Sequence, residues 1–421
     1  MSGFIGHGRD EVTPAHLLVP VEEHLEAILA MLPRPAPIDL RTGDGLGLIL
    51  AEPATCAVTL PAFDNSAMDG YAVVADDLAG ASRERPVRLT VVGEVAAGDA
   101  EAPTVARGTC VRIMTGATVP PGADAIVPVE VTVAEDEGAT VVFHLPPRVG
   151  DNIRRAGEDL VPGRELVAAG RRISPADVAL LSAAGVTTIS CLPAPRVVIM
   201  STGDELVPAE REPGPGQLRD SNAPMLAAMV RATGGVPFVT GVVRDDVAAL
   251  TEAFESNLGH ADLFVCTGGA SAGTRDLLPE VIGALGEVQA VSVAMRPGMP
   301  QIRGRIGATP VIGLPGNPVS SFVSFEVFVR PAIRALQGRR DVHRPTVVAR
   351  AAETLHAPPH KRGYLRVRLT RDGSGWAARP TGAQGSHVIS SIAQADGLAI
   401  VPEAVTEVRV GDEVRVMLLV D

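Results

Sequence analysis

Hydrophobic positions near the start of the chain repeat with a helical period. In residues 20–32, Val21, Leu25, Ile28 and Leu32 fall on one stripe, and acidic residues occupy the first turn. This pattern predicts an amphipathic helix whose apolar stripe packs on a neighbouring element.

Between about residues 55 and 150 the pattern changes to short runs rich in β-branched residues. The runs are VRLTVVGEV, TCVRIMTG, AIVPVEVTV and TVVFHL, and turn-forming Gly, Pro and Asp residues separate them. Such runs are typical of strands joined by tight turns, so we expect an all-β block. Helical signals return in residues 174–185, with Ser174 as a predicted N-cap, Pro175 as the first helical residue and Gly185 as the C-terminal cap.

Strand and helix patterns alternate through residues 196–338. The apolar runs RVVIM, PFVTGVV, DLFVCTGG and TPVIGLPG are separated by helical segments, and a last helix follows in PVSSFVSFEVFVRPAIRALQG. This alternation predicts a parallel sheet with helices on both faces. Residues 345–421 show strand patterns again, which predicts a small all-β C-terminal domain.

Composition favours a soluble protein of several domains with an aliphatic core. The 421 residues are enough for two to four domains of roughly 100–200 residues each, and 46% of the residues are hydrophobic while 3% are aromatic. The N-terminus lacks a secretory pattern, and no apolar stretch approaches the roughly 18 residues of a membrane span. We therefore expect a cytoplasmic protein.

Charge and metal-ligating residues exclude several classes of function. The formal net charge of -12 disfavours nucleic acids and anionic membranes, so an anionic ligand needs a local positive patch or backbone amides. The four cysteines are far apart without a C-x-x-C pair, so neither a zinc site nor a disulfide framework is indicated. The nine histidines lack i, i+4 pairing, and a histidine-based metal site is unsupported.

Three predicted strands end in unusual loops: STGDEL, CTGGASAGTRD and LPGNPVSS. In open α/β sheets ligands bind beyond the carboxyl ends of the strands. The second loop carries Gly268, Gly269, Ser271 and Gly273, and its missing side chains would let the backbone approach a phosphate. Asp276 closes this loop and could hold Mg²⁺, whereas the alternative is a glycine-rich turn without a ligand. The loop matches neither a Walker loop nor a dinucleotide fingerprint.

The other strand ends leave alternatives open. Asp204 and Glu205 could bind a metal or cap the next segment, and Asp245 is most simply a helix N-cap. The turn around Asn317 could present backbone amides to an anion or serve only as a structural turn. Arg296, on a Pro-Gly turn, could pair with an oxyanion or be solvated.

The stretch LPAFDNSAMDGYAV is unusually polar for a segment between predicted strands. Asp64, Asn65, Ser66 and Asp69 are all turn formers, so a loop capped by its own side chains is the simplest interpretation. Further along, the segment NIRRAGED offers Arg154 and Arg155, which could bind a phosphate or oxyanion or be solvated.

Seven motifs together resemble the molybdopterin molybdenumtransferases of molybdenum cofactor synthesis, a family related to the E domain of gephyrin. In order, they are FDNSAMDGYAV, RIMTGATVPPGADAIVPVE, NIRRAGEDL, STGDEL, TGGASAGTRD, GLPGNPVSS and GAQGSHVISSIAQADGLAIVP. The resemblance runs from about residue 16 to the end of the chain.

The resemblance implies an elongated homodimer of four-domain subunits. These are a discontinuous, elongated helical linking domain, a β-rich inserted domain, a three-layer α/β molybdopterin-binding domain with a parallel sheet and a C-terminal β-barrel-like domain. We expect them at residues 16–54 with 151–192, 55–150, 193–340 and 345–421, respectively.

The resemblance also implies a reaction and its site. Adenylylated molybdopterin and molybdate would yield molybdenum cofactor and AMP with Mg²⁺, in a site between the α/β domain of one subunit and the β-rich domain of the other. The implied catalytic acids are Asp69, Glu205, Asp245 and Asp276, with Glu205 and Asp276 as metal ligands. The implied substrate-binding residues are Thr115, Arg154, Gly268, Gly269, Ser271, Arg296 and Asn317.

One motif departs from the family pattern. Where many relatives carry two lysines in a K-P-G-K-P turn, this chain has Arg296 and Met299, followed by Gln301. Arg296 keeps one charge, but the Met299 side chain cannot bind an anion.

Two other functions share this fold. The adenylyltransferase that activates molybdopterin with ATP is usually a single domain, and it is also a possible partner of this protein. Animal relatives include non-catalytic scaffolds. The presence of all four implied catalytic acids argues against a loss of catalysis in this chain.

Overall fold

The computed structural model describes residues 18–269, 277–373 and 375–419. The chain divides into two compact units: unit 1 comprises residues 1–38 and 192–421, and unit 2 comprises residues 39–191.

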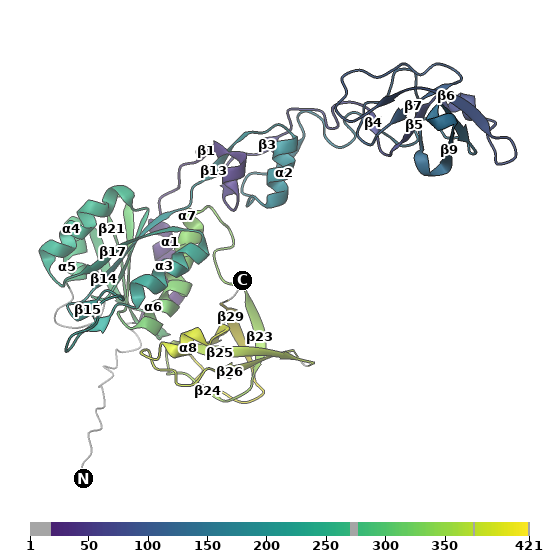
Figure 1. The fold of residues 1–421 in the computed structure, drawn as a ribbon. Coiled ribbons are helices and arrows are strands. Elements are labelled where there is room, and N and C mark those ends of the chain that lie inside the picture. The colour runs from purple at the N-terminus through teal and green to yellow at the C-terminus, as the bar shows by residue number, and fades with distance from the viewer. Residues whose placement is uncertain (1–17, 270–276, 374, 420–421) are drawn as a thin grey trace, which may run out of the picture. The chain divides into compact units, whose positions relative to one another are not determined.

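Unit 1 contains a six-stranded sheet in the order β17-β14-β18-β22-β21-β19 (Figure 1). Its strands are β14 (Arg196–Thr202), β17 (Val236–Val243), β18 (Leu263–Thr267), β19 (Glu287–Ser292), β21 (Pro300–Ile306) and β22 (Thr309–Leu314). The strands β17, β14, β18 and β22 are parallel, as the alternation predicts. The strands β21 and β19 add an antiparallel edge, because a tight turn at Gly307 (φ 58°) joins β21 to β22.

Helices cover both faces of this sheet. They are α1 (Val21–Met31), α3 (Asn222–Thr233), α4 (Val247–Asn257), α5 (Leu278–Leu285), α6 (Pro318–Ser324) and α7 (Arg330–Leu336). α4 and α5 pack on one face, and α1, α3, α6 and α7 pack on the other (Figure 1). Because both faces are covered, the central strands are almost continuously apolar.

The N-terminal helix packs where its apolar stripe predicts, but in the core of the α/β sheet. Val21, Leu25 and Ile28 are buried together with Phe328 and Ile333 of the C-terminal helical segment of the sheet domain. The described residues 18–38 therefore fall in unit 1, whereas the sequence interpretation grouped residues 16–54 with the linking domain. The domain boundaries, this one included, stay predictions.

The predicted helix after the PGNP turn is continuous but changes its pitch. A π-helical segment, η7 (Phe325–Val329), separates α6 from α7. Pro331 explains the change, because a proline lacks the N–H that would bond to the carbonyl of Val327 and its ring would clash with that carbonyl.

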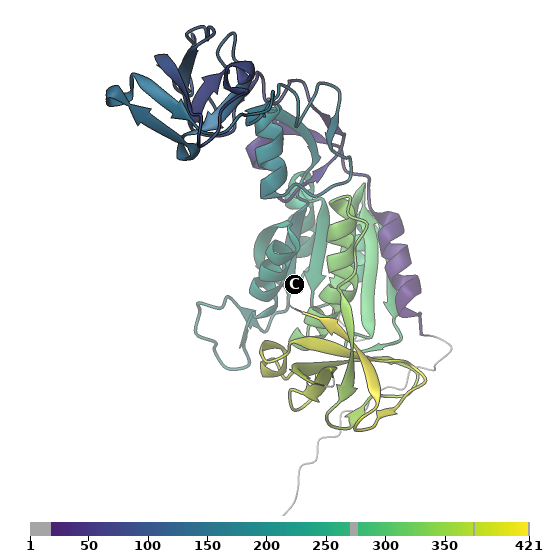
Figure 2. The same ribbon diagram turned by 90° about the vertical axis from the view of Figure 1, so that its right-hand side faces the viewer.

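The C-terminal part of unit 1 is a closed five-stranded barrel (Figure 2). Its strands are β23 (Thr346–Ala351), β25 (Arg362–Asp372), β26 (Gly375–Pro380), β27 (Gly397–Val401) and β29 (Glu413–Leu418). Pairing of β25 with β27 closes the barrel, which confirms the predicted C-terminal β domain. The smaller elements here are β20 (Met295–Arg296), which pairs with β25, then β24 (Leu355–His356), α8 (Ser390–Ala393) and β28 (Glu407–Val408).

Unit 2 holds the predicted β-rich block as a six-stranded sheet in the order β8-β5-β7-β6-β10-β9. The strands are β5 (Gly70–Val73), β6 (Val87–Val95), β7 (Thr109–Ile113), β8 (Ala125–Pro128), β9 (Thr132–Glu135) and β10 (Thr140–Phe143). The run AIVPVEVTV forms two strands rather than one, because Pro128 cannot donate a backbone hydrogen bond and a short helical turn follows it.

The rest of unit 2 combines a three-stranded sheet, in the order β1-β13-β2, with two short strand pairs and one α-helix. Its strands are β1 (Ile38–Arg41), β2 (Ile49–Leu50), β3 (Ala54–Thr55), β4 (Asn65–Ser66), β11 (Ile153–Arg154), β12 (Glu165–Val167) and β13 (Thr188–Leu192). The helix α2 (Pro175–Ala183) begins at Ser174, whose hydroxyl accepts a hydrogen bond from the backbone of Asp177 in a capping box. Gly185 follows the helix with φ 74°, as its predicted capping role requires.

A buried histidine on α1 makes folding of unit 1 sensitive to pH. The His24 side chain is fully buried, and its Nδ1 lies 2.9 Å from Nη1 of Arg303. Its ring packs edge-to-face with the ring of Phe328, with 4.7 Å between the ring centroids. Burial, reinforced by the charge of Arg303, lowers the pKa of His24 from 6.5 to about 3. The folded protein therefore holds this imidazole neutral.

We expect acid to destabilise the protein through His24. Below pH 6.5 the unfolded state binds a proton that the folded state excludes until about pH 3, so stability falls as the pH falls through this window. The loss should reach about 1.6 kcal/mol between pH 6.5 and pH 5, measured by urea unfolding. His24→Gln should flatten this dependence, whereas His260→Gln, which alters an exposed imidazole, serves as control. Equal slopes in wild type and His24→Gln would contradict the assignment.

Candidate active site

The carboxyl ends of three parallel strands meet in loops that contain closely packed glycines. After β18, Gly268 and Gly269 have φ values of 91° and 61°. A Cβ on Gly268 would lie 2.3 Å from the carbonyl oxygen of Thr202 at the end of β14. A Cβ on Gly316, in the turn after β22, would lie 3.6 Å from Cα of Gly268. The three loops therefore pack backbone against backbone at one edge of the sheet.

Carboxylates gather beside this edge. Asp245 follows β17, and its backbone N–H donates to Oδ1 of Asp204 at 3.3 Å. The Glu205 carboxylate folds back over Gly203, where a Cβ would lie 2.7 Å from Oε2 of Glu205. Desolvation, then repulsion from Asp204 and Glu205, raises the pKa of Asp245 against a hydrogen bond from Thr202.

The helix cap near Asp245 is the next residue. Asp246 is the N-cap of α4, and its Oδ1 accepts a hydrogen bond from the backbone of Ala249 at 2.9 Å. The simplest sequence interpretation, which made Asp245 the cap, is therefore wrong. The raised pKa of Asp245 is thus not a capping effect. It reflects desolvation first and then repulsion from its acidic neighbours.

Part of the glycine loop lies outside the described residues. Ser271 and Asp276 belong to residues 270–276, so their predicted roles stay predictions. In the described part of the chain, no group of three or more His, Cys, Asp or Glu residues is arranged to hold a metal ion. Glu205 and Asp245 nevertheless offer carboxylate oxygens, the ligand type that Mg²⁺ prefers.

The turn that carries Arg296 is anchored to the helical segment behind it. The fully buried Gln301 donates from Nε2 to the carbonyl of Gly298 at 2.6 Å and to Oγ of Ser324 at 2.7 Å. Arg296 itself is exposed, and Met299 is half-buried. Asn317 ends the neighbouring turn as the N-cap of α6, without a hydrogen bond from its side chain to the helix.

In unit 2, Asp69 and Thr115 form one exposed pair. Oδ1 of Asp69 accepts hydrogen bonds from the backbone N–H and the hydroxyl of Thr115, both at 2.7 Å. These bonds lower the pKa of Asp69, so its carboxylate stays charged. The exposed Arg154 lies opposite Asn65 in the pairing of β4 with β11, beside the same loop.

The remaining polar groups of this loop are structural. Asp64 accepts from Nη1 of Arg155 at 2.6 Å and from the backbone of Ala156 at 2.8 Å. Ser66 donates to the carbonyl of Met68 at 2.5 Å. The self-capped loop is thus confirmed for Ser66 and for Asn65, whose Nδ2 donates to the carbonyl of Phe63 at 3.2 Å. Asp64 instead ties the loop to the segment of Arg155 and Ala156.

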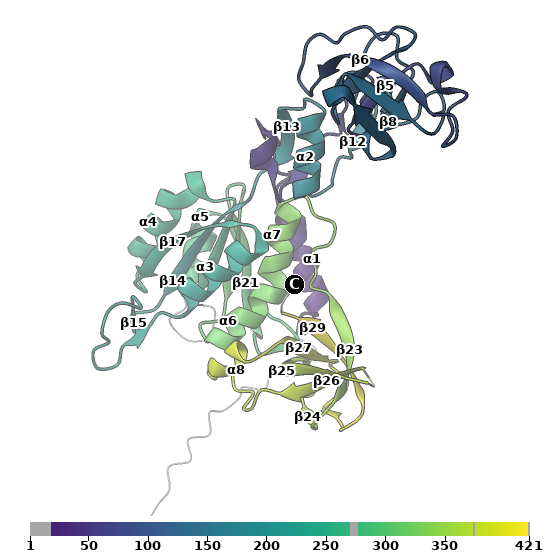
Figure 3. The ribbon, with the colours of Figure 1, turned by 45° about the vertical axis from the view of Figure 1, so that its right-hand side comes forward.

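Two polar residues at or near the candidate site were missed by the sequence analysis. The buried Asn222, the first residue of α3, donates from Nδ2 to Oγ1 of Thr267 at 2.9 Å and to the carbonyl of Gly316 at 2.7 Å. The only local signal for Asn222 is its place at a helix start. In sequence, Asn222 follows a short pair of parallel strands, β15 (Leu206–Val207) and β16 (Leu218–Arg219). The loop that connects these two strands extends away from the sheet (Figure 3).

The second missed residue is Arg366 in the barrel. Its guanidinium is fully buried, donates from Nε to Oγ of Ser391 at 3.1 Å, and has a pKa that burial lowers to about 10. In sequence it reads as the polar position of an alternating strand. Its Nη2 donates to the carbonyl of Gly385 at 3.2 Å, in the loop before α8. This loop contacts α6, where the backbone of Val319 donates to the carbonyl of Ser386 at 3.2 Å.

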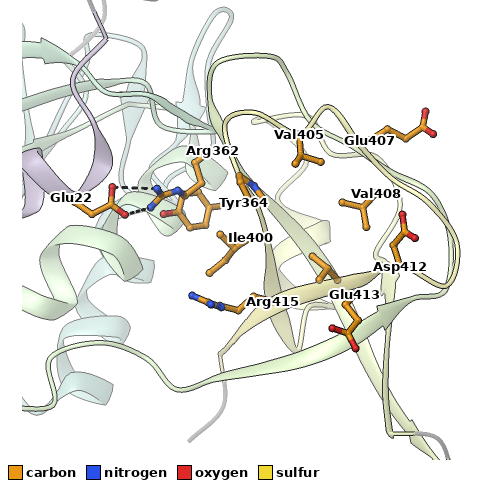
Figure 4. Close-up of a pocket in the computed structure, with 12 residues that line it drawn as sticks. Glu22, Arg362, Tyr364, Ile400, Val405, Glu407, Val408, Asp412, Glu413 and Arg415 are labelled. Carbon is orange, nitrogen blue, oxygen red and sulfur yellow. Dashed lines mark hydrogen bonds and ion pairs between the residues drawn. The ribbon is translucent and has the colours of Figure 1, made fainter.

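A cavity of about 730 Å³ lies elsewhere in unit 1, against the barrel (Figure 4). Glu22 from α1 faces Arg362 from β25 across its wall, and the two side chains form an ion pair. Tyr364, Ile400 and Val408 contribute apolar surface. None of the predicted site residues in the described ranges lines this cavity, so we place the candidate site at the strand ends.

Comparisons with known families cover almost the whole chain. Residues 19–185 match the MoeA N-terminal region (domain I and II), and residues 348–419 match the MoeA C-terminal region (domain IV). Residues 198–335, which include the glycine loops, match the family described as "Probable molybdopterin binding domain".

Individual relatives are similar over nearly their full length. Molybdopterin molybdenumtransferase 2 of Mycobacterium tuberculosis is 40% identical over 402 residues, which covers 94% of this chain and 98% of the relative. The enzyme of Bacillus subtilis is 35% identical over 382 residues, covering 89% and 88%. The crystal structure of the molybdopterin biosynthesis MoeA protein of Pyrococcus horikosii superposes with a TM-score of 0.81 at 35% identity, covering 95% and 99%.

Across the described residues, the helices are all too short or too polar to cross a membrane. The family matches, the full-length relatives and the fold agree with the motifs in the sequence. This chain therefore belongs to the molybdopterin molybdenumtransferases, a family of transferases in molybdenum cofactor biosynthesis.

Proposed function

We propose that this protein inserts molybdenum from molybdate into adenylylated molybdopterin and releases AMP. One observation supports this proposal most directly. The glycine pair Gly268 and Gly269 meets the turn of Gly316 at one edge of the sheet. The carboxylates of Glu205 and Asp245 lie beside the same edge. Bare backbone suits a phosphate or pyrophosphate, and adjacent carboxylates suit its counter-ion. The names of the full-length relatives support the same reaction.

In this reaction water hydrolyses the phosphoanhydride bond, so that AMP and the pterin phosphate separate. The two dithiolene thiols lose their protons and replace two oxygen ligands of molybdate, which leave as water. The task of the protein is mainly to position anions and to offset their charge. The backbone at Gly268 and Gly269 would hold the phosphate groups, with Ser271 as the predicted neighbour. Arg296 and Arg154, both exposed cations, would attract molybdate, although Met299 removes one charge that many relatives have.

Carboxylates at the strand ends fit a divalent cation in kind. Glu205 and Asp245 would bind Mg²⁺ together with the predicted ligand Asp276. Bound Mg²⁺ would neutralise charge on the pyrophosphate oxygens. The raised pKa of Asp245 fits such a place, because a cation would relieve the repulsion among these acids.

We also propose that the protein acts as a homodimer in which Asp69 and Thr115 serve the reaction of the partner subunit. Support comes from the geometry of the pair, since an exposed carboxylate fixed by two hydrogen bonds is prepared to orient a ligand. A separate adenylyltransferase would supply the adenylylated substrate and could dock on this protein. We place the activity in the cytoplasm.

The test is release of AMP from adenylylated molybdopterin. Purified protein should release AMP only when molybdate and Mg²⁺ are both present, and the pterin product should contain molybdenum. A product of adenylylated molybdopterin from molybdopterin and MgATP would instead identify the adenylyltransferase. Absence of both reactions would favour the non-catalytic scaffold.

A further inference from the structure

A chain of buried polar groups ties together the loops of the candidate site. Asn222 is the donor at one end, and Thr267 and Ser321 continue the chain. The three side chains come from the start of α3, the end of β18 and the first turns of α6. Their exposed fractions are 7%, 1% and 0%, so water is not a competing partner.

The hydrogen bonds of this chain have a consistent direction. Nδ2 of Asn222 donates one hydrogen to Oγ1 of Thr267 and the other to the carbonyl of Gly316. The hydroxyl of Thr267 has the carbonyl of Pro315 at 3.2 Å and Oγ of Ser321 at 3.0 Å within reach of its own proton. Ser321 donates to the carbonyl of Pro315. Linked bonds of this kind strengthen one another in a buried site.

The chain fixes the backbone that immediately precedes the glycine pair. Thr267 is followed directly by Gly268, and the carbonyl that Asn222 holds belongs to Gly316, next to Gly268. Among the described residues, the pairing of β18 with β22 ends at Thr267 and Leu314, so side chains help to set the relative position of the backbone that follows.

We infer that Asn222 is a positioning residue for the candidate site: it aligns Gly268 and Gly269, which follow β18, with the turn after β22. This inference rests on the proposed function only in naming the ligand that the aligned loops would receive, adenylylated molybdopterin. Without the amide of Asn222, the loops are aligned in only a fraction of the free molecules. The apparent affinity for the ligand is then reduced in proportion to that fraction.

The matched control is an amide at the other end of α3. Nε2 of Gln337 donates to the carbonyl of Thr233, the last residue of α3, at 3.0 Å. It ties the same helix to the helical segment behind it, but about 16 Å from Asn222 along a 12-residue helix. Gln337→Leu should therefore lower stability without disturbing the loops.

Hydrogen exchange of the free protein tests the alignment without substrate. In Asn222→Ala and Thr267→Val, amides in residues 263–269 and 315–321 should exchange about tenfold faster, because two buried hydrogen bonds or the central hydroxyl are lost. Thr267→Ser keeps the hydroxyl and should match wild type, as should Gln337→Leu in these segments. Unchanged exchange in Asn222→Ala would overturn the inference.

Steady-state kinetics tests the consequence. Asn222→Asp and Asn222→Ala should raise KM for adenylylated molybdopterin about tenfold and change kcat less, whereas Gln337→Leu should leave KM unchanged. Equal KM values for the Asn222 variants and Gln337→Leu would overturn the inference. If wild type releases no AMP, the proposed function fails, and the exchange experiment by itself then supports or overturns the alignment.

Discussion

Asp245→Asn is expected to lower the rate of AMP release about 100-fold, because the amide keeps the shape of the side chain but removes its charge. The raised pKa of Asp245 adds a pH dependence. In the metal-free site the carboxyl takes up a proton at a higher pH than an ordinary aspartate, and protons then compete with Mg²⁺. At limiting Mg²⁺ the wild-type rate should therefore begin to fall earlier as the pH is lowered. The measurement is AMP release against pH at saturating molybdate.

Asp204→Asn is the matched variant for this prediction. Its amide oxygen can still accept the hydrogen bond from the backbone of Asp245, but it removes one of the charges that raise the pKa of Asp245. Activity at neutral pH should persist, and the acid side of the profile should move to lower pH. A full rate for Asp245→Asn, or an unmoved profile for Asp204→Asn, would refute the role of Asp245.

Mixing two inactive variants is expected to restore activity if the site is shared between subunits. Asp69→Asn and Glu205→Gln should each be nearly inactive alone. In a symmetric dimer, random mixing places both changes in one of the two sites of each mixed dimer and leaves the other intact, so about a quarter of wild-type activity should return. Co-expression with two affinity tags would isolate the mixed dimer.

Two controls define the outcome of this mixing experiment. Asp69→Asn mixed with Thr115→Val should restore nothing, because both residues belong to one exposed pair and each site of the mixed dimer therefore receives an altered pair. Light scattering first establishes the mass of the wild-type protein. A monomer, or a mixed dimer without activity, would refute the proposal that Asp69 serves the partner subunit.

Local patterns predicted most of the fold, because the spacing of apolar and capping residues along the chain reflects which face of an element is buried and where the element begins. The period of Val21, Leu25 and Ile28 indicated the buried stripe of α1, and the Ser174 cap indicated the start of α2. Patterns failed where backbone chemistry interrupts a run, as at Pro128 and Pro331, which split one predicted strand and altered one predicted helix.

The candidate site was only partly readable for a related reason. Glycines at strand ends pointed to a ligand edge, and Gly268 does pack against the backbone of Thr202. The motif resemblance singled out Asp245, but local capping rules could not separate it from Asp246, because either aspartate suits a helix start and only the fold determines which carboxylate reaches the free N–H groups. Arg366 occupies the polar position of an alternating strand, and alternation does not reveal that a loop covers the outer face of the barrel.

The sequence by itself determined the family, the order of the elements and the glycine positions, since these depend on residue types and on spacing along the chain. Tertiary structure alone decided which polar groups meet: Asn222 bonds to the carbonyl of Gly316, 94 residues away. Such a bond depends on a distance of under 3 Å between segments that only the packed sheet brings together.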